Sequence, residues 1–134
     1  MKVLLTHADF IEFKPTFKEL SIADQVEQKL ERYEEVVVAF TAVEEGDDEE
    51  KVERMASEVE YALGRIGAKR VLVYPFAHLS SKLAKPKRAK ELLAAFVEEL
   101  KRRGFEVHRA PFGWTKELHL KVKGHPLAEQ LRTV

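Results

Sequence analysis

Polar side chains able to do acid–base chemistry follow two short apolar segments that both contain Pro-Phe. His78 comes after Pro75-Phe76-Ala77, and Lys116 comes after Pro111-Phe112-Gly113-Trp114-Thr115. Because proline lacks the N–H that a strand ladder needs, each strand is expected to stop at its proline. Loops after strand ends commonly carry the reactive groups of α/β sites. The sequence therefore predicts one site built from these two loops.

The chemistry open to these two groups is acid–base and electrostatic catalysis. The His78 imidazole can donate or accept a hydrogen bond and is a common acid–base group. Lys116 lies close in sequence to Phe112 and Trp114, whose rings could shelter its ammonium. A sheltered ammonium can hold a hydroxyl, a carbonyl oxygen or a water, and can stabilise a developing oxyanion. Taken alone, however, a single histidine is more often a packing or capping residue, and most lysines lie on the surface.

Glu129 is a third candidate. Its carboxylate could bind an amino group or orient Lys116. The alternative is an ordinary surface carboxylate in a frayed tail, because only five residues follow it. The residues themselves leave both interpretations open.

Several familiar hydrolase sites are missing from the sequence. There is no cysteine, no H-E-x-x-H pair, no glycine-rich phosphate loop and no G-x-S-x-G elbow. His119 and His125 have no acidic partner at metal-ligand spacing. We therefore expect neither a serine-triad esterase nor a zinc hydrolase, and we predict no metal and no cofactor.

The chain of 134 residues is expected to form one domain spanning 1–134. Its 23 basic and 23 acidic residues cancel, so it lacks the basic excess typical of a dedicated duplex-binding protein. A local basic cluster could touch the end of a nucleic acid, but taken alone it is better interpreted as a solvated helix start. The cluster consists of Lys82, Lys85, Lys87, Arg88 and Lys90.

The cellular setting is suggested by composition. The absence of cysteine fits a reducing cytoplasm, and the apolar run after Met1 is too short for a signal peptide or a membrane span. Asparagine is absent while lysine, glutamate and arginine abound, as in heat-adapted proteins. We expect a cytoplasmic protein with no membrane contact.

Hydrophobic spacing predicts an α/β fold in which a mixed β-sheet packs against helices. Helices are expected over 48–66, capped by Asp47, and over 86–103, with a weaker helix over 22–33. Phe10 to Lys14 is expected to form a second strand or an irregular edge that Pro15 limits. The other expected strands cover 2–7, 35–43, 69–74, 105–109 and 118–122.

Five separated segments agree in order and spacing with one known family: 1–10, 36–44, 74–81, 110–116 and 123–129. Together they resemble the amino-terminal editing domain of archaeal threonyl-tRNA synthetase over nearly the whole chain. That domain hydrolyses serine mistakenly attached to threonine tRNA. The resemblance implies a D-aminoacyl-tRNA deacylase-like fold and a homodimer.

The resemblance also implies roles for individual residues. Lys116 would lie by the bound aminoacyl group, with His78 and Glu129 completing the catalytic set. Trp114 and Thr115 stand where the family commonly has tyrosines, so a contact of a tyrosine hydroxyl must be made differently here. The implied substrate-binding residues are Ala42, Val43, Pro75, Phe76, Ala77, Phe112, Gly113, Trp114 and Thr115.

The function that the resemblance implies is hydrolysis of L-seryl-tRNA(Thr), helped by the vicinal hydroxyl of the terminal ribose. The expected partners are the 3′ end of tRNA(Thr), a second copy of the chain, and a threonyl-tRNA synthetase catalytic subunit in cis or in trans. One alternative is a D-aminoacyl-tRNA deacylase, although the Ser-Gln-Phe-Thr run and the Gly-Pro motif of those enzymes are absent. Another is a non-catalytic tRNA-end-binding or dimerisation module.

Overall fold

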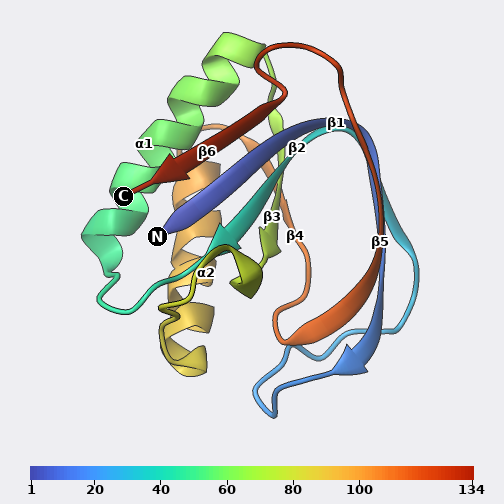
Figure 1. The fold of residues 1–134 in the computed structure, drawn as a ribbon, viewed down its shortest axis with the longest axis vertical. Coiled ribbons are helices and arrows are strands. Elements are labelled where there is room, and N and C mark those ends of the chain that lie inside the picture. The colour runs from blue at the N-terminus through green and yellow to red at the C-terminus, as the bar shows by residue number, and fades with distance from the viewer.

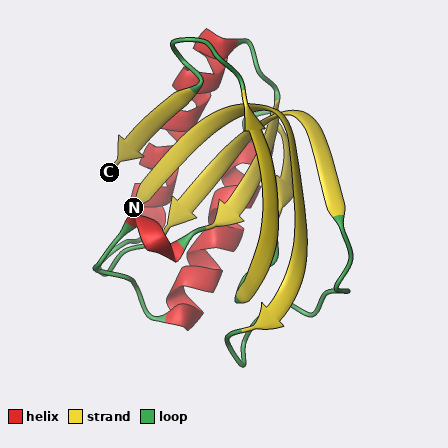
Figure 2. Cartoon of the chain, turned by 45° about the vertical axis from the view of Figure 1, so that its right-hand side comes forward, coloured by secondary structure: helices red, strands yellow, loops and turns green.

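Six strands form one mixed sheet in the computed structural model, which describes residues 1–134, and two α-helices lie on one side of that sheet (Figures 1 and 2). A short 3₁₀ turn, η1 (Ala77–Leu79), follows the third strand. The helices are α1 (Glu49–Ile66) and α2 (Pro86–Arg102). The strands are β1 (Lys2–Lys18), β2 (Glu31–Ala42), β3 (Arg70–Pro75), β4 (Glu106–Arg109), β5 (Trp114–Val122) and β6 (Glu129–Thr133).

The strand order is β4-β3-β2-β1-β5, and β6 also pairs with β1. Strands β2, β3 and β4 are parallel, and each parallel connection runs through one of the helices. Strand β1 is antiparallel to β2, β5 and β6. The expected mixed sheet packed with helices is therefore confirmed.

Strand β1 is longer than the sequence pattern suggests. Its pairing continues past Pro15, which lies opposite Lys116 on β5, and a register shift follows between Pro15 and Phe17. The expectation that Phe10 to Lys14 forms a separate strand or an irregular edge is wrong. The irregularity beside Pro15 lets the strand accommodate a residue that cannot donate to the ladder.

The helix expected over 22–33 is also wrong. Residues 22–30 form no regular element, and β2 begins at Glu31. The four-residue spacing of Ile22, Val26 and Leu30 is helical, but these residues are 36%, 40% and 60% exposed. A helix here would therefore not be stabilised by packing against the core. Instead the segment binds the loop before β5.

The cap of α1 differs from the expectation by one residue. The Asp48 side chain accepts the Lys51 N–H at 3.0 Å, whereas Asp47 turns toward the chain terminus. Gly67 ends the helix in the left-handed conformation, as the sequence predicts.

Apolar side chains fill both faces of the sheet. Val37 and Ala39 of β2 belong to the large core between the sheet and the helices. Val38 and Phe40 alternate with them and belong to a smaller core on the other face, together with Tyr74. This second core places the Tyr74 ring beneath the candidate site.

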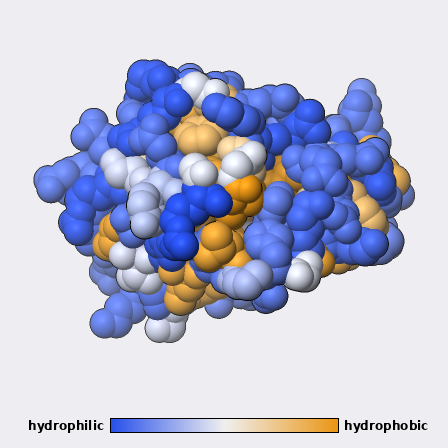
Figure 3. Space-filling view, turned by 90° about the horizontal axis from the view of Figure 1, so that it is seen from above, coloured by the Kyte–Doolittle hydropathy of each residue, from blue (hydrophilic) through white to orange (hydrophobic).

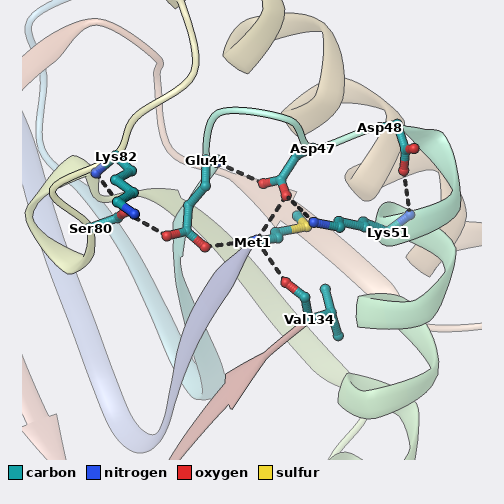
Figure 4. A network of polar contacts seen from close by, with 8 residues as sticks. All are labelled: Met1, Glu44, Asp47, Asp48, Lys51, Ser80, Lys82 and Val134. Atoms are coloured by element: carbon teal, nitrogen blue, oxygen red, sulfur yellow. Dashed lines mark hydrogen bonds and ion pairs between the residues drawn. The ribbon is translucent and has the colours of Figure 1, made fainter.

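Met1 and Val134 meet in a partly buried polar network (Figure 4). The Met1 ammonium donates to Glu44 and Asp47, both at 2.9 Å, and to the Val134 carbonyl at 3.1 Å. The Ser80 hydroxyl donates to the other Glu44 oxygen at 2.6 Å. That bond, together with the Met1 ammonium, outweighs burial and lowers the pKa of Glu44. The network thus ties the start of β1 to the segment that follows η1.

The end of the molecule seen from above is mainly hydrophilic around a small hydrophobic centre (Figure 3). The connection from β5 to β6 crosses this end (Figure 1). The candidate site lies at the opposite end of β5, where that strand begins.

Neither helix combines the length and apolar composition needed to cross a lipid bilayer.

Candidate active site

A cavity of about 440 Å³ opens where β3 ends, between the start of α2 and the start of β5. Both Pro-Phe loops contribute to it, so the structure brings together the two segments that the sequence singled out. His78 and Lys116 line it. So do all the residues that the resemblance marks as substrate-binding: Ala42, Val43, Pro75, Phe76, Ala77, Phe112, Gly113, Trp114 and Thr115.

Lys116 is the partly buried cation of this cavity. Its ammonium donates to the Trp114 carbonyl at 2.9 Å and to the Pro111 carbonyl at 3.1 Å, and it lies 4.7 Å from the centre of the Tyr74 ring. Burial lowers its pKa to about 8, although Glu19 and Asp24 favour the charged form. An ammonium has three N–H donors, so one remains after the two carbonyl bonds. Lys116 can therefore offer a fixed positive charge to a ligand in the cavity.

His78 lies on η1, exposed at the edge of the cavity. Its ring meets the Phe76 ring edge-on, with 5.1 Å between the ring centres. No protein group hydrogen-bonds to the imidazole, so both of its nitrogens are available to a ligand.

Glu129 does not reach the cavity within one chain. It is the exposed first residue of β6 and pairs with Thr6 of β1, whereas Lys116 pairs with Pro15 of the same strand. Nine residues of strand span on the order of 30 Å. The tail is ordered by strand pairing rather than frayed, and Glu129 is an exposed surface carboxylate of β6.

Asp24 fixes the wall of the cavity. Its carboxylate accepts the Phe112 N–H at 2.9 Å and the Arg109 guanidinium at 3.0 Å, and its own carbonyl accepts the Trp114 indole N–H at 2.8 Å. Burial alone would raise the pKa of Asp24, but the Phe112 N–H, Arg109 and Lys90 outweigh it and lower that pKa. The Trp114 ring is thereby held in place.

We expect Asp24→Ala to lower the free energy of unfolding by about 1–3 kcal/mol, because the Phe112 N–H loses its acceptor. Asp24→Asn keeps an acceptor oxygen and should lose less. The lowered pKa of Asp24 stabilises the fold at neutral pH, and this contribution disappears as the pH falls below the usual aspartate range. Urea unfolding at pH 7 and pH 3 measures both effects. Equal stability of wild type and Asp24→Ala at pH 7 would contradict this role.

Gly113 allows the segment 20–24 to pack closely against the start of β5. Its φ is +81°, and a Cβ at this position would lie 2.7 Å from the Cβ of Ala23. Such a contact is shorter than folded proteins tolerate, so only glycine fits between the segment 20–24 and the start of β5.

The sequence pattern did not indicate two residues that lie near Lys116 in the structure. Glu19 accepts a hydrogen bond from the Thr115 hydroxyl at the cavity edge, and no motif marks it. Tyr74 lies beneath the ammonium, and its position directly before Pro75 was the available signal. Burial raises the pKa of Tyr74 to about 12, so its ring stays neutral.

No three histidine, aspartate or glutamate side chains converge in a way that could hold a metal ion. The groups that line this cavity include an ammonium, an imidazole, the Glu19 carboxylate, the Thr115 hydroxyl, backbone carbonyls and aromatic rings. Such groups can hold polar parts of a ligand by hydrogen bonds and flat rings by stacking.

Over residues 1–134 the sequence matches the family described as the archaea-specific editing domain of threonyl-tRNA synthetase. The chain belongs to this family. It is 45% identical over 135 residues to the threonine–tRNA ligase of Nitrosopumilus maritimus, covering 100% of this chain and 21% of that protein. It is 45% identical over 139 residues to the threonine–tRNA ligase of Thermococcus kodakarensis, covering 100% of this chain and 22% of that protein.

The editing-domain chain thus spans about a fifth of the length of the curated relatives that it matches. Among solved structures it is similar to the c-Myc DNA unwinding element binding protein. The TM-score is 0.74 at 10% identity, over 100% of this chain and 99% of that one. At this identity the likeness shows the fold alone, which is the D-aminoacyl-tRNA deacylase-like fold that the resemblance implied.

Proposed function

We propose that this chain removes wrongly attached L-serine from tRNA(Thr) by hydrolysing the ester to the terminal ribose, and spares L-threonyl-tRNA(Thr). The observation that carries the proposal is the Lys116 ammonium, which two carbonyls hold in a cavity beside the Tyr74 ring. Membership of the editing-domain family supports the choice of substrate.

In the proposed reaction a water oxygen attacks the ester carbonyl carbon, and the carbonyl oxygen gains negative charge. The remaining Lys116 N–H stabilises that oxyanion. The C–O bond to the ribose then breaks, the ribose oxygen takes a proton, and free serine leaves. The vicinal ribose hydroxyl assists the water, and His78 hydrogen-bonds to the substrate at the cavity edge. An ester that is already activated needs no protein nucleophile for this step.

The discrimination against threonine acts on the reaction rather than on binding. One methyl group changes affinity by only about 1–3 kcal/mol, and a pocket that admits threonine cannot reject it by size alone. The Pro111 and Trp114 carbonyls hold the Lys116 ammonium at one position, and the reaction depends on the placement of this ammonium and of the attacking water. We propose that the extra methyl of threonine displaces the attacking water or the ammonium.

The proposed partners are the 3′ end of tRNA(Thr), with Trp114 available to stack on adenine, and a second copy of the chain. Glu129 stays a proposed catalytic residue. Because it does not line the cavity of its own chain, it could act only at the cavity of the second copy. A synthetase catalytic subunit, in cis or in trans, and a cytoplasmic setting complete the proposal.

The test is deacylation of preformed L-Ser-tRNA(Thr), L-Thr-tRNA(Thr) and a D-aminoacyl-tRNA by this chain alone. We expect rapid loss of serine, with threonine retained and the D-ester hydrolysed no faster than in buffer. Loss of the D-ester alone would instead make the protein a D-aminoacyl-tRNA deacylase. No turnover of any substrate would favour a non-catalytic binding module.

A further inference from the structure

The segment between η1 and α2 faces the cavity with its apolar residues and solvent with its lysines. Leu83, and Pro86 at the first turn of α2, line the cavity, whereas Lys82, Lys85 and Lys87 are exposed. None of these three lysines has a carboxylate within 4 Å of its ammonium. Three free positive charges therefore lie beside the mouth of the cavity.

Neighbouring basic residues are engaged within the protein. The Arg88 guanidinium lies 2.7 Å from a Glu49 oxygen, and the Lys90 ammonium lies 3.4 Å from an Asp24 oxygen. The basic cluster seen in the sequence thus divides into two structural cations and three unpaired ones.

The acidic residues within 44–50, around the start of α1, do not neutralise the three free lysines. Glu44 and Asp47 bind the Met1 ammonium, and Asp48 caps α1. Glu45 and Glu50 have no ion-pair partner, and neither lies within 4 Å of these lysines. The free lysines remain available to an external anion.

Backbone contacts hold this lysine segment in place. The Glu45 N–H donates to the Lys82 carbonyl at 2.8 Å, and the Ala84 N–H donates to the Val43 carbonyl at 3.0 Å. In addition, no side chain caps the start of α2, whose exposed N–H groups add partial positive charge next to Lys85 and Lys87. The charges are displayed on a fixed edge rather than on a free loop.

We propose, resting on the ester-hydrolase function above, that Lys82, Lys85 and Lys87 bind the sugar–phosphate backbone of the tRNA 3′ arm outside the cavity. An aminoacyl ester inside the cavity places its terminal adenosine at the mouth, so the phosphates of the preceding nucleotides must leave along one side. The chain has a net charge of zero, so no overall field attracts RNA. Attraction must come from a local group of free cations, which this edge supplies.

The test compares the triple variant Lys82→Gln, Lys85→Gln, Lys87→Gln with the matched triple Arg54→Gln, Arg65→Gln, Lys69→Gln. The control removes the same three charges from exposed, unpaired residues that do not line the cavity. Thermal unfolding checks that both variants fold. Binding of uncharged tRNA(Thr) is measured from low to moderate salt, and hydrolysis is measured with L-Ser-tRNA(Thr) and with the L-seryl ester of adenosine.

We expect the lysine triple to bind tRNA roughly tenfold more weakly at low salt and to reduce the slope of log affinity against log salt by about 2, since each phosphate contact contributes about 0.7. Its loss in kcat/KM with tRNA should be in KM, and hydrolysis of the adenosine ester should match wild type. The control triple should match wild type in all of these.

Equal affinity and equal salt slope in the two triple variants would overturn the phosphate-binding edge. If the triple lysine variant lost tRNA binding while neither wild type nor any variant hydrolysed either ester, the phosphate-binding role of the three lysines would be supported. The proposed hydrolase function would then be contradicted. A lysine triple that lost both substrates equally would place these lysines in the reaction itself, against the proposal.

Discussion

Lys116→Met is expected to slow hydrolysis of L-Ser-tRNA(Thr) by at least about a hundredfold while leaving the fold intact. Removing one preorganised oxyanion donor typically costs about 10²–10³ in rate. Methionine fills a similar volume but has no N–H to offer. Single-turnover deacylation with excess protein isolates this step from tRNA binding, whose affinity should be nearly unchanged.

The same variant should be no less stable than wild type. Lowering the pKa of a lysine from 10.5 to about 8 costs the folded state at most about 3 kcal/mol at neutral pH. Two carbonyls lose a partner, at about 1 kcal/mol each, so the net gain of the variant is at most about 1 kcal/mol. The cost is complete below pH 8 and disappears as the pH rises toward 10.5, so the advantage of the variant should shrink over that window.

Lys69→Met is the matched control, because Lys69 is exposed before β3, at the end of that strand away from the cavity. It should hydrolyse L-Ser-tRNA(Thr) at the wild-type rate. If Lys116→Met did the same, the ammonium would have no part in the reaction. For wild type, the catalysed rate should lose its lysine contribution as the pH rises through about 8.

Gly113→Ala is expected to lower the free energy of unfolding by about 2–5 kcal/mol and to abolish most of the activity. The left-handed backbone costs a residue with a Cβ about 1–2 kcal/mol, and forcing the new Cβ against Ala23 costs about 1–3 kcal/mol more. Relief of the contact would move the segment 20–24 outward, which separates Asp24 from Phe112. Urea unfolding and deacylation assays measure the two effects.

Gly67→Ala separates the two causes. Gly67 has nearly the same backbone, with φ of +79° against +81°, but no atom lies within 4 Å of the position that the new methyl would take. This variant should lose only the backbone contribution of about 1–2 kcal/mol and keep full activity. Equal losses of unfolding free energy in the two variants would show that the contact with Ala23 does not contribute to the destabilisation.

The helices and parallel strands could be predicted because their signals are local. Apolar residues from Val52 to Leu63 recur at helical spacing, and Gly67 marks the end of that helix. Strand β3 is an apolar run that stops at Pro75. Residues 22–30 show the limit of such signals. Their apolar spacing resembles a helix, yet the hydrogen bonds with Phe112 depend on a loop some 90 residues later in the chain.

The position of the cavity could be predicted from such local signals, but the residues that hold its wall in place could not. Both Pro-Phe loops indicate strand ends, so His78 and Lys116 could be placed near one another from the sequence. Asp24 and Glu19 come from a polar stretch without a motif, and only tertiary pairing brings them to Lys116. The position of β6 likewise depends on its pairing with β1, which is distant in sequence. The sequence therefore could not show that Glu129 lies away from the cavity of its own chain.

The long strand β1 has a consequence for the order in which the protein can assemble. Its first half pairs with β6, as Lys2 does with Thr133, and its second half pairs with β5, as Phe13 does with Leu118. Strand β1 therefore waits for β5 and β6, which are synthesised long after it, before its second edge is covered. Contacts so distant in sequence slow folding. Until synthesis nears residue 133, that open edge can join a neighbouring nascent chain, which makes this step the most exposed to aggregation.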